Sequence, residues 1–266
     1  MKIKVINPNT TWAMTAKIEE CARAVAGPGT FVDAVSPATG PASIESHYDE
    51  ALSVPGILTE IATGERDGVD GYVIACFGDP GLDAARELAT GPVVGIAEAA
   101  THYASFLGRG FSIVTTLGRT RGRAADLVER YGMGRHCLGI HSCDIPVLDL
   151  DHNPDSRKVI RDACFDALDR DGADAIVLGC AGMADLCRSL SDELGVPVVD
   201  GVTAAVTMVQ SLVTLGLSTS ARNEFARPIP KPYTGILAQY GLQLRTMPLP
   251  KRDVQPSSAR QCRFDA

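Results

Sequence analysis

The sequence predicts an α/β protein of two pseudo-symmetric lobes, each with a mainly parallel β-sheet flanked by helices. Short runs rich in valine and isoleucine alternate with longer alanine-rich stretches of helical periodicity, which is the pattern of βα units. One of these units occurs twice in the chain, so the two halves are expected to share one architecture. Because ligands of open parallel sheets bind beyond the carboxyl ends of the strands, we expect the active site in the cleft between the lobes.

Eight segments have the composition of β-strands, and helical patterns lie between most of them. The expected strands cover residues 3–7, 30–35, 71–76, 93–96, 111–115, 138–142, 175–180 and 196–200. The expected helices cover residues 15–25, 83–89, 122–131, 157–169, 184–194 and 203–215, with a further alanine-rich helix starting at Ala97.

The internal repeat pairs residues 67–76 with residues 171–180. Aspartate, glycine, aspartate and cysteine coincide in the two segments at a constant spacing of 104 residues. The likeness continues from residues 91–94 to residues 195–199, with one residue inserted in the second copy. Both copies end in a cysteine, Cys76 and Cys180, at the carboxyl end of a predicted strand. If those strand ends face each other, the two thiols meet across one cleft.

The repeat also suggests the domain boundaries. Residues 1–100, together with about 205–220, are expected to form the first lobe, and residues 101–204 the second. Beyond about residue 220 the chain has six prolines and little periodicity, so residues 221–266 are expected to form an extended C-terminal tail.

Composition excludes several classes of partner. The chain has 266 residues, a formal net charge of −7 and a pI of about 5.2, so it lacks the basic character that binds nucleic acid or anionic membranes. The first residues enter a strand pattern directly, and no apolar run resembles a signal peptide or a membrane span. We therefore expect a cytoplasmic protein whose partner is a small molecule.

The eight cysteines are expected to be free thiols in a reducing compartment. They form no Cys-x-x-Cys motif and no cysteine/histidine cluster of zinc spacing, so no metal site is expected. A single cysteine at a strand end is usually a small core residue. Duplication in a repeat raises the case for catalysis at Cys76 and Cys180, although a repeat can also retain a core cysteine twice. The unpaired cysteines, expected in helices, strands or the tail, are Cys21, Cys137, Cys143, Cys164, Cys187 and Cys262.

Two opposed thiols suit the inversion of a carbon acid, which needs a base on one face and an acid on the other. The ordinary thiol pKa of about 8.5 lets one group serve in either state. Asp79 is expected to cap a helix that has Pro80 at its first position, and residues 181–184 are expected to open another helix. Helix N-termini would stabilise a thiolate or an enolate-like intermediate.

Polar groups at other strand ends should line the same cleft. Asn9 and Thr115 are examples, although Asn9 can equally cap the next helix. Ser43, Ile44 and Glu45 follow a loop rich in proline and glycine and are expected to form a lid, with a plain surface charge as the alternative for Glu45. The expected substrate-binding residues are Asn9, Ser43, Ile44, Phe77, Gly78, Thr115, Thr116, Ala181 and Gly182.

No cofactor is expected. None of the few lysines has a setting that suggests a Schiff base with pyridoxal phosphate, and no glycine-rich nucleotide motif is present. Two other functional classes fit the sequence less well. A two-lobed binding protein needs no thiol pair, and a thiol redox protein needs two sulfurs close enough to bond, which a substrate between them prevents.

Four segments resemble the Asp/Glu/hydantoin racemase superfamily, and within it the hydantoin racemases. They cover residues 6–10, 73–81, 95–100 and 176–183, and the likeness extends over about residues 1–220. The resemblance implies two flavodoxin-like lobes around a pseudo-twofold axis, catalytic cysteines at Cys76 and Cys180, no cofactor and a homo-oligomer. The tail departs from the compact pattern of the family.

The resemblance also suggests a substrate. Amino-acid racemases of the superfamily carry polar residues after each cysteine, whereas this chain has Phe77-Gly78 and Ala181-Gly182. These neutral residues suit a ring imide better than a zwitterion, so we expect a 5-monosubstituted hydantoin, with allantoin as the close alternative. An amino-acid racemase or a decarboxylase of the same superfamily remains a further alternative, although some decarboxylases keep only one of the two cysteines.

Overall fold

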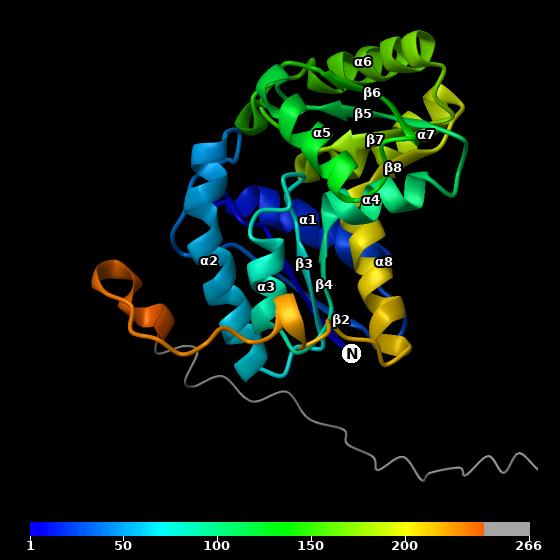
Figure 1. Ribbon diagram of the computed structural model, residues 1–266. Helices are drawn as coiled ribbons and strands as arrows, with labels where there is room; N and C mark the ends of the chain where they lie inside the picture. The colour runs from blue at the N-terminus through cyan, green and yellow to red at the C-terminus, as the bar shows by residue number, and fades with distance from the viewer. Residues whose placement is uncertain (242–266) are drawn as a thin grey trace, which may run out of the picture.

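The structure is a computed structural model that describes residues 1–241 and contains two four-stranded parallel sheets (Figure 1). The first sheet has the order β2-β1-β3-β4, and the second has the equivalent order β6-β5-β7-β8. All neighbouring strands are parallel. The predicted α/β fold with two similar lobes is therefore confirmed. The strands are β1 (Lys2–Ile6), β2 (Phe31–Val35), β3 (Gly71–Ile74), β4 (Val93–Gly95), β5 (Phe111–Thr115), β6 (Cys137–Ser142), β7 (Ala175–Gly179) and β8 (Val198–Asp200).

Helices flank both sheets, as expected for βα units. We call the first sheet with α1, α2, α3 and α8 the first lobe, and the second sheet with α4, α5, α6 and α7 the second lobe. The helices are α1 (Trp12–Ala24), α2 (His47–Arg66), α3 (Leu82–Leu88), α4 (Ile96–Ala104), α5 (Arg121–Arg130), α6 (Ser156–Asp171), α7 (Cys187–Leu194) and α8 (Gly201–Thr214). None of the helices in residues 1–241 is long and apolar enough to cross a membrane.

The sequence does not predict α2, and its composition explains why. Pro55 lies inside the helix, and Gly56 follows it. A methyl group on Gly56 would lie only 2.7 Å from Pro37 Cβ, so close packing requires the glycine. The Ser46 hydroxyl caps the first turn by accepting a hydrogen bond from the Asp49 N–H at 3.2 Å. Tertiary packing and this cap thus stabilise a helix that local propensity disfavours.

The two lobes exchange helices where the chain passes between them. The segment α4 follows β4 of the first sheet but contacts β7 and β8 of the second, while α8 follows β8 and contacts β3 and β4 of the first. The two helices also pack against each other, and the Tyr103 and Thr207 hydroxyls share a hydrogen bond of 3.1 Å. The backbone therefore crosses between the lobes at both helices (Figure 1), and the Tyr103–Thr207 hydrogen bond adds a link between side chains.

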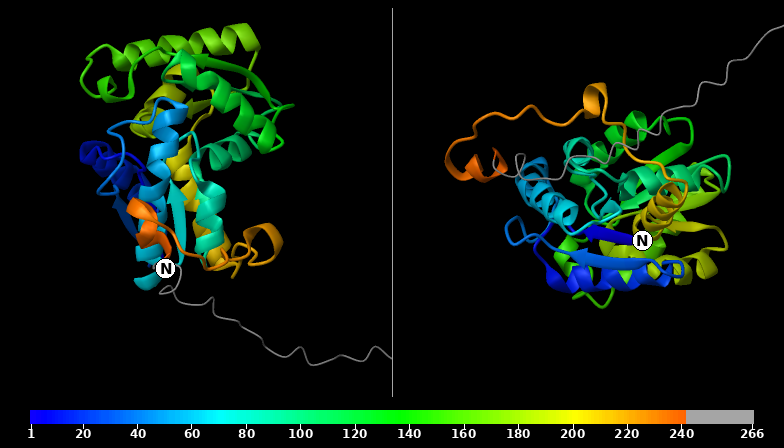
Figure 2. Two further views of the ribbon diagram at one scale, coloured as in Figure 1. Left: turned by 60° about the vertical axis from the view of Figure 1, so that its left-hand side comes forward. Right: turned by 90° about the horizontal axis from the view of Figure 1, so that it is seen from below.

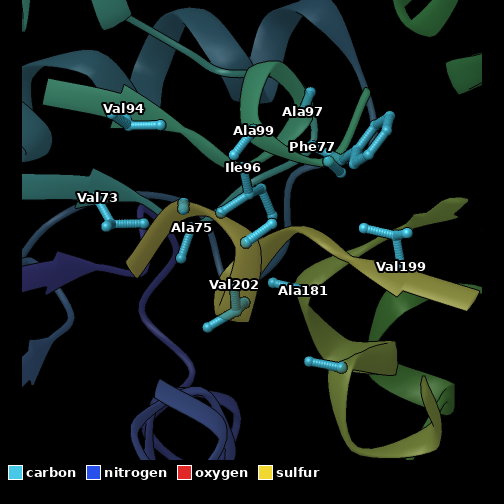
Figure 3. Close-up of a cluster of buried hydrophobic side chains, with 14 of the residues drawn as sticks. Val73, Ala75, Phe77, Val94, Ile96, Ala97, Ala99, Ala181, Val199 and Val202 are labelled. Carbon is cyan, nitrogen blue, oxygen red and sulfur yellow. The ribbon is translucent and has the colours of Figure 1, made fainter. Parts of the chain in front are cut away.

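One apolar core runs through both lobes. It contains Val73 in β3, Val202 at the start of α8 and Ala181 next to the second cysteine (Figure 3). Val73 and Val202 are fully buried. Because burial of apolar surface is the main favourable term in folding, the elements that carry the two cysteines are held together by this shared core.

The C-terminal segment of the described chain lies against the first lobe (Figure 2). It has little regular structure apart from two short 3₁₀ turns, Asn223–Phe225 and Gly235–Leu237. The Tyr240 hydroxyl donates to the Pro55 carbonyl at 3.0 Å, which ties the segment to α2. Residues 242–266, including Cys262 and the rest of the expected tail, lie outside the described residues.

Candidate active site

A cavity of about 190 Å³ lies between the lobes, at the carboxyl ends of both sheets. Both repeat cysteines line it. Nine residues proposed from the sequence line the cavity: Asn9, Ile44, Cys76, Phe77, Gly78, Thr115, Thr116, Cys180 and Ala181. Two proposed residues, Ser43 and Gly182, are absent from the lining. Further lining residues that the sequence did not single out are Met14, Ser46, His47, Glu50, Arg119, Thr120, Arg123 and Val147.

The two cysteines begin matching turns. The Asp79 N–H returns to the Cys76 carbonyl at 2.9 Å, and the Met183 N–H returns to the Cys180 carbonyl at 3.1 Å. Both side chains are half-buried free thiols. In each turn the glycine two residues later hydrogen-bonds the cysteine sulfur through its backbone, Gly78 at Cys76 and Gly182 at Cys180. Gly182 thus hydrogen-bonds the Cys180 sulfur, although it does not line the cavity.

Burial and the backbone donors shift the two thiol pKa values in opposite directions. Burial raises the pKa of Cys76 well above its ordinary value and raises that of Cys180 to about 11. The backbone hydrogen bonds of Gly78 and Gly182 oppose this, because an N–H donor stabilises the thiolate. Burial therefore favours the protonated thiol over the thiolate at both positions.

Nearby charges act differently on the two thiols. Cys180, when it is ionised, further raises the pKa of Cys76, as do the carboxylates of Glu50 and Asp79, because each then places negative charge near its sulfur. Around Cys180, the carboxylate of Glu45 raises the thiol pKa and the Lys17 ammonium lowers it. The influence of Cys180 on Cys76 also indicates that the two thiols are electrostatic neighbours.

The prediction that Asp79 caps the helix directly after Cys76 is wrong. The helix after the Cys76 turn, α3, begins at Leu82 with Gly81 as its N-cap, and Pro80 is outside it. Gly81 has a φ of +65°, a left-handed conformation that suits glycine. Cys76 therefore lies in a tight turn and not at a helix N-terminus, and the donor to its sulfur is the Gly78 backbone. Cys180, in contrast, directly precedes a 3₁₀ helix, Ala181–Leu186, that leads into α7.

Asp79 instead caps α4. Its buried carboxylate accepts the N–H groups of Ala97 and Glu98 at 3.1 and 2.9 Å, and the Tyr131 hydroxyl at 2.7 Å. Burial raises the pKa of Asp79 to about 6, although all three donors lower it. A methyl group on Gly95, the N-cap residue of α4, would overlap the carboxylate. This long-range cap fixes the Cys76 turn against the second lobe.

Glu50 and Arg123 form a charged pair beside Gly78. The Arg123 guanidinium, from α5, donates to the Gly78 carbonyl from Nη2 at 2.7 Å and from Nε at 3.2 Å. Its Nε also lies 3.3 Å from Glu50 Oε1. Burial raises the pKa of Glu50, and Arg123 opposes that shift. No local motif marks either residue in the sequence, because the unpredicted helix α2 carries Glu50 and the other lobe carries Arg123.

The loop before α2 borders the cavity, with Ile44 and Glu45 in the lining. Glu45 Oε1 accepts the Val147 N–H at 2.6 Å, so the loop of the first lobe is tied to the second lobe. Glu45 is therefore not a free surface charge, and the lid stays a prediction. Ser43 belongs to the same loop but does not reach the lining.

Neutral polar groups complete the lining. Asn9 Oδ1 accepts hydrogen bonds from Asn7 Nδ2 at 3.0 Å and from the Thr11 N–H at 2.9 Å, so it stabilises the turn before α1. Its Nδ2 faces the Met14 sulfur at 3.3 Å, a weak acceptor that a ligand oxygen could replace. The Thr115 hydroxyl shares a hydrogen bond of 2.9 Å with Thr120. Within residues 1–241 no cluster of three potential ligands could hold a metal ion.

Comparisons with known proteins identify the family to which the chain belongs. The model of the Asp/Glu/hydantoin racemase family matches residues 3–209. The chain belongs to this family. A hydantoin racemase of Pseudomonas sp. (strain NS671) is 50% identical over 242 residues, which cover 91% of this chain and 97% of the relative. A hydantoin racemase of Rhizobium meliloti is 51% identical over 229 residues, which cover 86% and 95%.

Solved structures give the same result for this member of the racemase family. An allantoin racemase from Klebsiella pneumoniae is 53% identical, with a TM-score of 0.88 over 90% of this chain and 98% of that chain. An arylmalonate decarboxylase, 18% identical with a TM-score of 0.60 over 85% and 98%, shares the fold. The predicted family is confirmed, and the similar hydantoin and allantoin racemases support a racemase function.

Proposed function

We propose that this chain is a cofactor-independent racemase that interconverts the enantiomers of 5-monosubstituted hydantoins, with Cys76 and Cys180 as the two proton-transfer groups. The observation that carries the proposal is the pair of half-buried thiols at equivalent positions of the two lobes, both lining one cavity. Each thiol has a backbone N–H donor from the glycine two residues later. The names of the curated relatives supply the substrate class.

The reaction needs one thiolate and one thiol at the start of each turnover. The thiolate removes the proton from C5 of one enantiomer, and the electron pair of the C–H bond moves into the adjacent carbonyl to give an enolate. The opposite thiol then protonates C5 on its other face. The proton states of Cys76 and Cys180 are exchanged at the end, so the same pair is ready for the other enantiomer.

The raised thiol pKa values fit this exchange. A buried thiolate that lacks bulk water is a stronger base than a solvated one, so each sulfur can remove a weakly acidic proton once it is ionised. The N–H groups of Gly78 and Gly182 limit the cost of that ionisation. Phe77 and Ala181, which directly follow the cysteines, add neutral surface to the cavity lining.

Allantoin is the second candidate, because its substituent is a polar ureido group on the same ring. The solved allantoin racemases from Klebsiella pneumoniae and Pseudomonas fluorescens are 53% and 39% identical to this chain. The lining also includes the Glu50–Arg123 pair, whose carboxylate and guanidinium can hydrogen-bond a urea. An apolar substituent would instead contact side chains such as Ile44 and Val147.

The test uses separate enantiomers of 5-benzyl-, 5-isobutyl- and 5-ureidohydantoin in heavy water. Optical rotation and deuterium at C5 are followed with and without protein, since hydantoins also racemise spontaneously. We expect loss of rotation together with deuterium incorporation from both enantiomers. A preference for the ureido compound would identify allantoin as the substrate. Full two-way activity in either Cys76→Ala or Cys180→Ala would contradict the two-thiol mechanism.

The proposal includes self-association, which the family resemblance implies. Phe106 at the end of α4 is 79% exposed, and its neighbour Leu107 is 48% exposed, so this corner offers apolar surface for a second copy. Sedimentation equilibrium of the full chain should give a mass above 28.1 kDa, whereas a monomer at all concentrations would contradict this part.

A further inference from the structure

The two glycines that support the thiols have unlike neighbours. A methyl group on Gly78 would lie 2.4 Å from Glu50 Oε1, whereas on Gly182 it would lie 3.0 Å from Leu150 Cδ1 and 3.7 Å from Met14 Cε. One glycine is therefore packed against a carboxylate and the other against apolar side chains. The repeat makes the two turns alike in backbone, so the difference comes from the residues packed around them.

Arg123 and Met14 hold equivalent places in the two lobes. Each is the third residue of the helix that follows the first strand of its lobe, α5 after β5 and α1 after β1. Each also reaches the glycine of the opposite lobe, Arg123 at Gly78 and Met14 at Gly182. The pseudo-twofold relation thus places a guanidinium at one thiol turn and a thioether at the other.

We propose that Arg123 is a positioning residue for Cys76 alone. Through two hydrogen bonds it fixes the Gly78 carbonyl and so keeps the Gly78 N–H directed at the Cys76 sulfur, while its charge compensates the Glu50 carboxylate. This inference rests on the proposed two-thiol function for its catalytic meaning. The contacts of Arg123 with Gly78 and Glu50, however, do not depend on that function.

The charged groups around Cys76 explain why the position requires a cation. Glu50 faces the turn from α2, Asp79 belongs to the turn itself, and Cys180 faces it from the other lobe. The His47 ring lies 3.9 Å from Glu50 but is largely exposed, so it is a weak counter-charge. Without Arg123, negative charge on Glu50 and Asp79 would oppose ionisation of Cys76 with only the Gly78 N–H in favour.

Cys180 has a different arrangement. Lys17 is its cationic neighbour, but the Lys17 ammonium is paired with Asp151 and Asp185 of the second lobe. It therefore acts on the thiol through its charge and does not hold the Gly182 backbone. Loss of Arg123 should leave Cys180 unchanged.

Thiol reactivity separates the two cysteines where steady-state rates cannot. Enantiomers have equal free energy in an achiral solvent, so kcat/KM for racemisation must be equal in the two directions for every variant. A defect at one thiol lowers both values together. Alkylation of each cysteine, in contrast, reports the thiolate population of that residue alone.

The experiment measures iodoacetamide alkylation of Cys76 and Cys180 separately, by peptide mass spectrometry of the full, unliganded chain over a range of pH. In Arg123→Met we expect Cys76 alkylation to slow about tenfold at fixed pH and its profile to move about one unit higher. The Cys180 profile should not move. Arg123→Lys should restore part of the rate, because it returns the charge but not the paired donors.

The matched control is Arg130→Met. Arg130 lies on the same helix and also reaches the first lobe, where it pairs with Asp83 rather than with Gly78. This variant should leave both alkylation profiles unchanged. Equal slowing of Cys76 and Cys180 in Arg123→Met, or no effect at Cys76, would overturn the inference.

A second variant keeps the test decisive if Arg123→Met does not fold. Glu50→Gln removes the opposing carboxylate and leaves the Arg123 charge uncompensated, so Cys76 should react faster, by about two- to fivefold. No change at Cys76 would again overturn the inference. Racemisation of hydantoins is measured in parallel. A chain that alkylates as expected but racemises no hydantoin contradicts the proposed function only.

Discussion

Asp79 and Tyr131 join the two lobes through the hydrogen bond that the Tyr131 hydroxyl donates to Asp79 Oδ2 at 2.7 Å. Asp79 comes from the Cys76 turn of the first lobe, and Tyr131 directly follows α5 of the second. The same carboxylate accepts the N–H groups of Ala97 and Glu98 at the start of α4. A single buried carboxylate therefore connects the Cys76 turn with the start of α4 and with the end of α5.

This contact predicts a pH dependence of stability. The pKa of Asp79 is about 6 in the folded chain and 3.8 in its ordinary state, so between these values the folded chain binds more protons than the unfolded chain. The contribution of Asp79 to the free energy of unfolding must then fall as the pH rises through this window and stay constant above it. Asp79→Asn cannot titrate at this position, so its stability should decline less over this window than that of the wild type.

Urea unfolding of wild type and Asp79→Asn between about pH 4 and 7 measures the difference. Tyr131→Phe serves as the control. It removes a donor that lowers the pKa of Asp79, so it should extend the declining window to higher pH. Parallel stability curves for wild type and Asp79→Asn would show that the carboxyl does not titrate in this range.

The glycines beside the thiols predict unequal sensitivity to a methyl group. In Gly78→Ala the new Cβ would displace Glu50 from Arg123, because it would lie 2.4 Å from Oε1. In Gly182→Ala the nearest atom, Leu150 Cδ1 at 3.0 Å, is the end of a flexible side chain. We expect kcat to fall at least about tenfold further in Gly78→Ala, which corresponds to about 1.4 kcal/mol. Equal losses in the two variants would argue against a special role of the charged pair.

The strands and the cysteines were accessible to sequence analysis because their signals are local. Val73 and Val177 belong to short apolar runs bounded by turn residues, and the repeat shows that Cys76 and Cys180 end equivalent runs. Period and spacing are sufficient for such features, since a parallel sheet brings the carboxyl ends of its strands to one edge.

The missing parts of the site depend on contacts between distant segments. The sequence around Asp79 predicts a local helix cap, but the hydrogen-bond partners of its carboxylate lie on α4 and at Tyr131. Glu50 lies on a helix that a proline obscures in the sequence, and Arg123 reaches it from the other lobe. Neither Glu50 nor Arg123 belongs to the repeated motif. Their pairing follows from how the lobes face each other, which the chain order does not reveal.

The loop contact of Glu45 predicts an effect on substrate binding. Removing its carboxylate in Glu45→Ala frees the loop from the Val147 N–H, so the bound state must restrain a more mobile loop. We expect KM to rise about three- to tenfold with a smaller change in kcat, which is the signature of lost uniform binding. Glu45→Gln keeps an acceptor oxygen and should stay near wild type. A loss confined to kcat would instead place Glu45 in the chemical step.

Lys17 predicts a shift at the second thiol. Its ammonium lowers the pKa of Cys180, so Lys17→Met should raise that pKa and move alkylation of Cys180 to higher pH. Cys76 should be unaffected, which makes it the internal control. The Asp185→Asn variant removes a carboxylate paired with Lys17 and should move Cys180 in the opposite direction, although less, since Asp151 still pairs with the lysine. Unchanged Cys180 reactivity in Lys17→Met would show that solvent screens the charge.

The two-thiol proposal makes its sharpest prediction for the single cysteine variants. In Cys180→Ala, Cys76 can still remove the C5 proton of the enantiomer whose hydrogen faces it, and in heavy water the same sulfur can return a deuteron to the same face. That enantiomer should therefore exchange its C5 hydrogen without inversion, while the other enantiomer remains unlabelled. Cys76→Ala should show the opposite preference, because only the second face retains a base.

Chiral chromatography with mass detection measures label and configuration together. A control without protein corrects for spontaneous exchange, and the Cys76→Ala/Cys180→Ala double variant should match it. If one single variant labels both enantiomers, one base reaches both faces of C5 and the opposed arrangement of the sulfurs is not needed. If each single variant labels one enantiomer and the two choose opposite hands, the thiols must act from opposite sides of the substrate.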